Sequence, residues 1–226
     1  MKVFSDLCTL IKKKVTKDEI PTASNKTQPY RLRCGSFVEF ENIGINDISE
    51  NTNFGLCPDS QPVAALGKVD LGQHVYLNRY YMDDDETWMQ FNMQGDINDV
   101  ESAQNTIEEM ILWKYHHTDT PTSKVQLKNI LSTIGLQTID LDGKTYERVW
   151  GEGIRSEMVE FSENVYIDKD DVVDYTVKHS CMLYRRAIPD STRIEFYLIS
   201  AEESGDGVLV VHSIGVSITK EDFKTF

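Results

Sequence analysis

The alternation of apolar and polar residues over 67–91 predicts two antiparallel strands around an acidic turn. Each strand has one apolar face: Val75, Leu77, Arg79 and Tyr81 in the first, and Met89, Phe91 and Met93 in the second. Placing both apolar sets on one side of the sheet requires a loop of odd length. We therefore expect a loop of three or five residues drawn from Asp83–Thr87.

Strand patterns dominate the rest of the chain after Cys34. In 138–151 the pair Asp142-Gly143 predicts a hairpin with a type I′ turn, because both residues tolerate positive φ. The segment IEEMILWKYHH has some helical periodicity, but its aromatic content favours a strand. Further strands are expected at 36–43, 107–117, 180–188, 193–202 and 207–218.

Two helices are expected. SKVQLKNILSTIG (123–135) places apolar residues on one side, with Ser123 or Thr122 as the N-cap and Gly135 at the end. Residues 3–15 also have helical spacing and end in a lysine triplet. The predicted fold class is α+β: a mostly antiparallel β-sheet built from hairpins, with one central helix and an N-terminal helix.

Charge divides the chain into a basic head and an acidic body. Residues 1–33 carry eight Lys/Arg and three Asp/Glu, whereas the whole chain has a net charge of −14. We expect a basic helix and linker at 1–33 and an acidic β-rich domain at 34–226. An alternative divides that domain into two similar subdomains, about 34–120 and 121–226. The acidic balance argues against a nucleic-acid partner, because phosphate binding needs a basic surface.

The N-terminus and the cysteines predict a cytoplasmic protein. MKVFSDLCTLIKKKV has no small-residue cleavage site, and the four cysteines include no CxxC pair. Reduced thiols are therefore expected, without a structural zinc site. The N-terminal helix has two open roles, docking on the domain's core or peripheral contact with the inner membrane. The membrane contact would use Val3, Phe4, Leu7, Ile11, Lys12, Lys13 and Lys14.

Two groups of residues are candidates for ligand or partner binding. Asp83, Asp84, Asp85 and Glu86 offer oxygen ligands, but the EF-hand spacing is absent, and a solvated turn is the favoured interpretation. The second group consists of arginines flanked by aromatic or apolar residues; if their faces met, they would form an anion site. Otherwise their stems cover the sheet. This group comprises Arg79 with Tyr81, Arg148 with Tyr146 and Trp150, and Arg185.

The remaining motifs do not indicate catalysis. His116 and His117 are adjacent, so on a regular strand they point to opposite faces and cannot readily share a metal. His212 lies in line with apolar residues and is expected to be a satisfied, half-buried side chain. GxSxG, HExxH and Walker motifs are absent from the sequence. We therefore expect no cofactor, no metal and no catalytic residue. Whether the protein is an enzyme is left open, and a non-enzymatic role is favoured.

Several stretches together resemble the YjfK-like bacterial proteins of unknown function. They are GKVDLGQHVYLNRYYMDDDETWMQFN, the TDTP segment, IGLQTIDLDGKTYERVWGEG, MLYRR and IEFYLIS, and the likeness covers about residues 35–220. QGDINDV (94–100) departs from a glycine-rich stretch typical of that family. The resemblance carries over no catalytic residue. It implies a gene context of membrane-stress proteins, small integral membrane proteins and ATP-grasp ligases.

Two functional hypotheses follow from the sequence. The first is a cytosolic accessory protein that binds an unidentified protein partner and is linked to envelope or membrane stress. The second is a small-ligand or metal-binding protein, conceivably an enzyme, that uses Arg79, Arg148 and Arg185 or the Asp83–Glu86 turn.

Overall fold

The computed structural model describes residues 32–41, 43–99, 102, 105–167, 172–204 and 207–226. All strand pairings in these residues are antiparallel. The strands are β1 (Phe37–Phe40), β2 (Gln61–Gly72), β3 (Val75–Met82), β4 (Thr87–Gln94), β5 (Thr106–Asp119), β6 (Thr138–Leu141), β7 (Lys144–Arg148), β8 (Val159–Tyr166), β9 (Tyr175–Ala187), β10 (Ile194–Ser204), β11 (Gly207–Ile218) and β12 (Phe223–Thr225).

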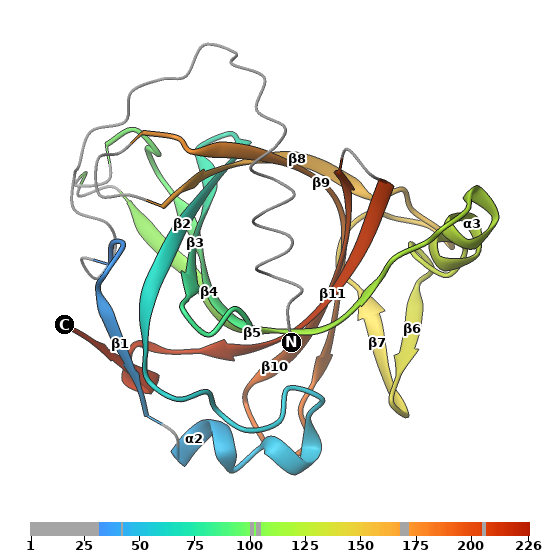
Figure 1. Ribbon diagram of the computed structural model, residues 1–226. Coiled ribbons are helices and arrows are strands. Elements are labelled where there is room, and N and C mark those ends of the chain that lie inside the picture. The colour runs from blue at the N-terminus through green and yellow to red at the C-terminus, as the bar shows by residue number, and fades with distance from the viewer. Residues whose placement is uncertain (1–31, 42, 100–101, 103–104, 168–171, 205–206) are drawn as a thin grey trace.

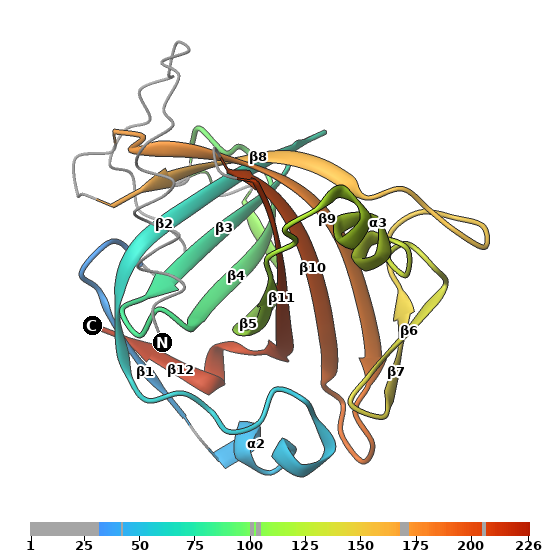
Figure 2. The ribbon, with the colours of Figure 1, turned by 45° about the vertical axis from the view of Figure 1, so that its right-hand side comes forward.

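Eight of these strands form a closed barrel. The pairing order runs from β2 through β3, β4, β5, β11 and β10 to β9. Strand β8 pairs with β9 on one side and with β2 on the other, and so closes the ring. Figure 1 looks into this ring, and Figure 2 shows β8 and β9 crossing above the other strands.

The remaining elements lie outside the barrel. Strand β1 pairs with the start of β2 on one side and with β12 on the other. Strand β7 of the β6–β7 hairpin pairs with β9. In Figure 1 this hairpin and α3 lie beside the barrel wall. Among the described residues, each helix falls short of the length and apolar content that crossing a membrane needs. The helices are α2 (Ile43–Asn46), α3 (Lys124–Leu131) and the 3-10 turns η2 (Ser49–Asn51) and η3 (Lys220–Asp222).

The fold class predicted from the sequence is wrong. The protein is mostly antiparallel β with a closed eight-stranded barrel, and α3 is a peripheral helix of eight residues without a buried side chain. Its predicted N-cap is confirmed, since the Ser123 side chain accepts the Gln126 backbone N–H. The helix is not central because the strands close on themselves and line the barrel interior with their own side chains. The predicted N-terminal helix falls outside the described residues.

The predicted odd loop between β3 and β4 is also wrong, and the cause is burial on both faces. The loop has four residues, and Tyr81 pairs with Trp88. Arg79 and Tyr81 therefore share the interior face with Trp88. The apolar set of β4 lies outside, where Phe91 packs against Phe223 of β12. A strand covered on both faces has no single apolar face from which register can be deduced.

Other local predictions are confirmed. Residues 107–117 lie within β5, and the β6–β7 hairpin turns at Asp142 and Gly143, which have φ of 48° and 74°. The type I′ signal succeeded because it depends on the backbone of two residues and not on tertiary packing.

The stacked indoles of Trp88 and Trp113, 5.0 Å apart, fill part of the interior and depend on a glycine in β11. Gly215 lies opposite Trp113, and a Cβ there would lie 2.7 Å from the Trp113 ring. We expect Gly215→Ala to lower the free energy of unfolding by about 1–3 kcal/mol, because the ring cannot move without disturbing Trp88. Urea unfolding checks this. Lys178→Ala, at an exposed position of β9, is the control, and equal stability of both variants would contradict the assignment.

Candidate functional site

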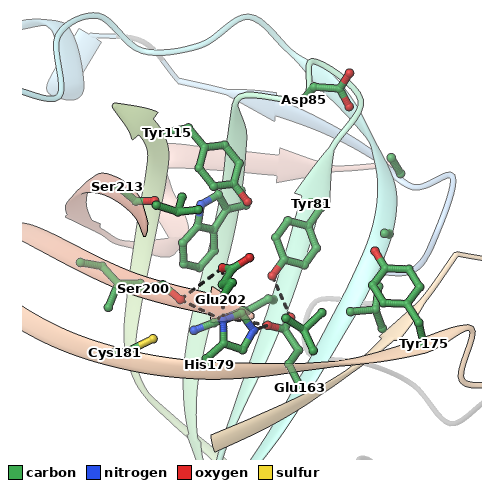
Figure 3. A pocket seen from close by; sticks show the side chains of 18 of the residues that line it. Tyr81, Asp85, Tyr115, Glu163, Tyr175, His179, Cys181, Ser200, Glu202 and Ser213 are labelled. Carbon is green, nitrogen blue, oxygen red and sulfur yellow. Dashed lines mark hydrogen bonds and ion pairs between the residues drawn. The ribbon is translucent and has the colours of Figure 1, made fainter. Parts of the chain in front are cut away.

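One end of the barrel interior holds a cavity of about 240 Å³ whose wall draws on all eight barrel strands. An eight-stranded barrel is just wide enough either to be filled by side chains or to hold one small ligand. Here the aromatic pair fills part of the interior, and ionisable residues border the space that remains (Figure 3). The ionisable and hydroxyl-bearing residues used below are Arg79, Tyr81, Glu163, His179, Ser200 and Glu202.

Glu163 of β8 is the centre of this cluster. Its carboxylate is fully buried and accepts hydrogen bonds from Arg79 Nη1 at 2.6 Å and from the Tyr81 hydroxyl at 2.8 Å. His179 Nε2 lies 3.0 Å from the same carboxylate. Arg79, itself buried, also donates Nε–H to Gln90 and lies over the Trp88 ring. A buried carboxylate is tolerated only when paired and hydrogen-bonded in this way.

A glycine makes room for this carboxylate. Gly67 of β2 pairs with Arg79 of β3 on one side and with Val165 of β8 on the other. A Cβ on Gly67 would lie 1.7 Å from Glu163 Oε1. The missing side chain therefore lets Arg79 and Glu163 reach each other across β2 inside the barrel.

His179 connects Glu163 to a second carboxylate. Its Nδ1 lies 3.1 Å from Ser200 Oγ and 3.4 Å from Glu202 Oε1, and the Ser200 hydroxyl donates to Glu202 at 3.2 Å. Figure 3 shows the His179 ring between Glu163 and the Ser200–Glu202 pair. Since both ring nitrogens face acceptors, the surroundings favour the doubly protonated imidazolium.

The pKa values follow from these contacts. Burial alone would raise the pKa of Glu163, but the charge of Arg79 and the hydrogen bonds from His179 and Tyr81 outweigh it and hold the pKa at about 2. Burial lowers the pKa of His179, whereas its contacts with Glu163 and Glu202 raise it, with a net rise. The contacts therefore favour the charged forms of both Glu163 and His179.

Ser200, His179 and Glu163 have the contacts of a hydroxyl, base and carboxylate, but the arrangement favours binding over acyl transfer. The Ser200 hydroxyl donates to Glu202 and not to the imidazole. The surrounding segments of β8, β9 and β10 are paired in regular antiparallel ladders, which engage their backbone amides. An oxyanion hole would need such amides to be directed at the cavity.

The residues predicted as a site from sequence are placed in different regions. Arg79 and Tyr81 join the interior cluster, and Asp85 lines the cavity. Arg148 donates to the carbonyls of Gly135 and Gly153, and Arg185 is exposed on β9. The three arginines therefore do not build a common anion site.

The other predicted site residues contact the protein's own turns and core. Asp84 Oδ1 accepts the backbone N–H groups of Glu86 and Thr87, so it shapes the acidic turn, where Asp83 also lies. Tyr146 is buried outside the barrel and donates its hydroxyl to Glu195. Trp150 is partly buried and packs against two groups of buried apolar residues, one that includes Tyr146 and one that includes Trp88 and Trp113.

Sequence reasoning missed Glu163, His179, Ser200 and Glu202. Each occupies an alternating position in phase with apolar residues, as in Phe161-x-Glu163-x-Val165 and His179-x-Cys181-x-Leu183. The pattern that could have identified them is an ionisable residue on the same face of a strand as its apolar residues. These residues meet only when β8, β9 and β10 come together in the closed barrel. The sequence of a single strand does not show that pairing.

Replacement of the central carboxylate tests the cluster. Glu163→Gln leaves the Arg79 guanidinium buried without its anion, so we expect the free energy of unfolding at pH 7 to fall by about 3–5 kcal/mol. Chemical denaturation checks this. Glu160→Gln, on the same strand but exposed, is the matched control.

The pH dependence provides a second test. Because the folded pKa of Glu163 lies below its ordinary value of 4.5, its stabilisation is present above pH 4.5 and is lost as pH falls through about 2. We expect Glu163→Gln to flatten stability against pH in this window. An unchanged slope would contradict the assigned pairing.

The comparisons with known proteins give one match. A family model described as "Protein of unknown function (DUF2491)" matches residues 10–224, most of the chain. No curated protein and no solved structure matched the chain.

Proposed function

The chain belongs to the DUF2491 family of proteins of unknown function, and we propose that it binds a small organic ligand inside its barrel. The observation that carries the proposal is the 240 Å³ cavity, which is closed in by all eight strands and lined by ionisable groups. At about 30 Å³ for each water in the liquid, this volume corresponds to roughly eight waters and suits a compact molecule. Pockets of this kind, with apolar walls and a few polar groups, are typical ligand sites.

The charges that line the cavity favour a ligand with an amine or ammonium group. Arg79 and Glu163 neutralise each other through their direct contact. Besides tyrosine hydroxyls and the Cys181 thiol, the wall also includes the imidazole of His179 and the carboxylates of Glu202 and Asp85. Ionised carboxylates accept hydrogen bonds and cannot donate, so a ligand that donates N–H groups matches them.

Aromatic rings support the same class of ligand. Tyr81, Trp88, Tyr115 and Tyr175 contribute to the cavity wall, and in Figure 3 Tyr81 and Tyr115 stand above the cluster of Glu163, His179 and Glu202. A ring face attracts a cation within about 6 Å, by about 0.5–2 kcal/mol, and Arg79 already lies 5.0 Å above the Trp88 ring. Aromatic faces and carboxylates together favour an organic cation over an anion.

Calorimetry with small amines, and with alcohols and carboxylates of matched shape, tests this function. We expect one amine site per chain and an effect on Trp fluorescence, since Trp88 lies on the wall. Glu202→Gln should raise the amine Kd about tenfold or more, because a hydrogen bond to a charged group contributes about 1.5–3 kcal/mol. Glu160→Gln, on the outer face, should leave it unchanged. Amines that bind no better than the matched alcohols would overturn the proposal.

The accessory role is a separate proposal, with different support. It is supported by the basic segment 1–33 and by the gene context that the resemblance to YjfK-like proteins implies. The matched family model describes only a protein of unknown function, so this role is more specific than the family description. On this view the protein is cytoplasmic, peripheral at the inner membrane, and binds a protein partner. Flotation with anionic vesicles should recover the full chain but not a chain lacking 1–33. Equal failure of both would contradict the membrane contact.

A further inference from the structure

A cluster of two histidines and one aspartate lies on the outer face of β5 and β11, apart from the interior cavity. His117, Asp119 and His212 each offer one ligand atom, and these atoms all lie within 4.8 Å of one another. We propose that the three residues bind a divalent transition-metal ion of the Zn²⁺ class. Imidazole nitrogen and carboxylate oxygen are the donors that such ions prefer.

An irregularity in the strand pairing brings the two histidines together. His212 pairs with His117, but the next residue, Ser213, pairs with Tyr115, so His116 is an extra residue in β5. Since Tyr115 lines the interior cavity, strict alternation would also direct His117 inward. The bulge reverses that direction and places the His117 ring against the His212 ring, with centroids 3.9 Å apart. Strict alternation along β5 fails at this position because β-bulges re-aim side chains.

The distances suit coordination. His212 Nε2 lies 3.1 Å and His117 Nε2 lies 3.8 Å from the same oxygen, Asp119 Oδ2. Two ligand atoms about 2.0–2.1 Å from a tetrahedral ion lie about 3.3–3.4 Å apart. Both separations are within about half an ångström of that value, so small side-chain rotations accommodate an ion. His117 and Asp119 are partly exposed and have room for such rotations.

A second contact orients the buried histidine. Tyr197 of β10 places its hydroxyl 2.6 Å from His212 Nδ1. When Nδ1 carries the proton and donates to Tyr197, the lone pair of Nε2 faces Asp119. Metal-binding histidines typically have such a partner on the other nitrogen.

The cluster borders a cavity of about 450 Å³, whose wall includes Asp119, His212, Asp140 of β6 and residues after α3. Structural zinc sites are closed by four protein ligands, whereas sites with three protein ligands keep a position for water or a small ligand. Two histidines and one carboxylate beside a cavity match the second type. The proposed ion would therefore keep an exchangeable position on the cavity side.

The test uses the full chain, freed of metal by a chelator and titrated with Zn²⁺ and separately with Co²⁺. We expect one ion per chain by calorimetry, a higher midpoint of thermal unfolding with metal, and visible Co²⁺ absorption typical of nitrogen ligation. His117→Ala and Asp119→Asn change partly exposed residues and should each weaken Zn²⁺ binding at least tenfold. His74→Asn removes a distant imidazole and keeps a residue that tolerates its φ of 63°, so binding should be unchanged.

Three results would overturn the proposal. The first is wild-type protein that takes up no Zn²⁺ or Co²⁺ at millimolar concentration. The second is uptake that the His117 and Asp119 variants leave unchanged, because the ion would then bind elsewhere. The third is Co²⁺ uptake with the spectrum of the hydrated ion. The amine-binding proposal rests on other residues and stands or falls separately.

Discussion

The burial of one carboxylate inside a closed barrel is the constraint on which much of this structure depends. Glu163 lies on β8, the strand that closes the ring, and its main partner Arg79 lies on β3, on the far side of β2. The pair therefore joins strands that share no backbone hydrogen bonds. Gly67 leaves the space through which they meet. Because an unpaired buried charge costs several kcal/mol, closing the barrel and satisfying this carboxylate require each other.

The barrel wall separates two kinds of chemistry. The inner face holds the aromatic pair of Trp88 and Trp113 and the charged network around Glu163, whereas much of the outer face is an apolar core shared with β1, α2 and β12. The outer face turns polar where β5 and β11 approach the β6–β7 hairpin. Both sites thus lie where polar side chains interrupt an apolar surface, one on each side of the same wall.

Sequence patterns predicted local structure and failed at closure. The β6–β7 turn, the N-cap of α3 and the strand at 107–117 followed from residues close together in the chain. The register of β3 and β4 could not be predicted in this way. Both faces of the hairpin are buried, so the alternation of residues does not show which face points into the barrel. Arg79 and Tyr81 were recognisable candidates. Their partners Glu163 and His179 were not, because only long-range pairing brings them near.

The seam between β2 and β8 also bears on how the protein folds. Leu66 pairs with Tyr166, 100 residues later in the chain, and only four residue pairs form the seam. Contacts between such distant segments incur the largest loss of chain entropy before they contribute any stability, so barrel closure should come late and set the folding rate. Until then, β2 and β8 have unpaired edges that could join another chain. Slow closure would therefore prolong the stage at which these edges are open to pairing with another chain.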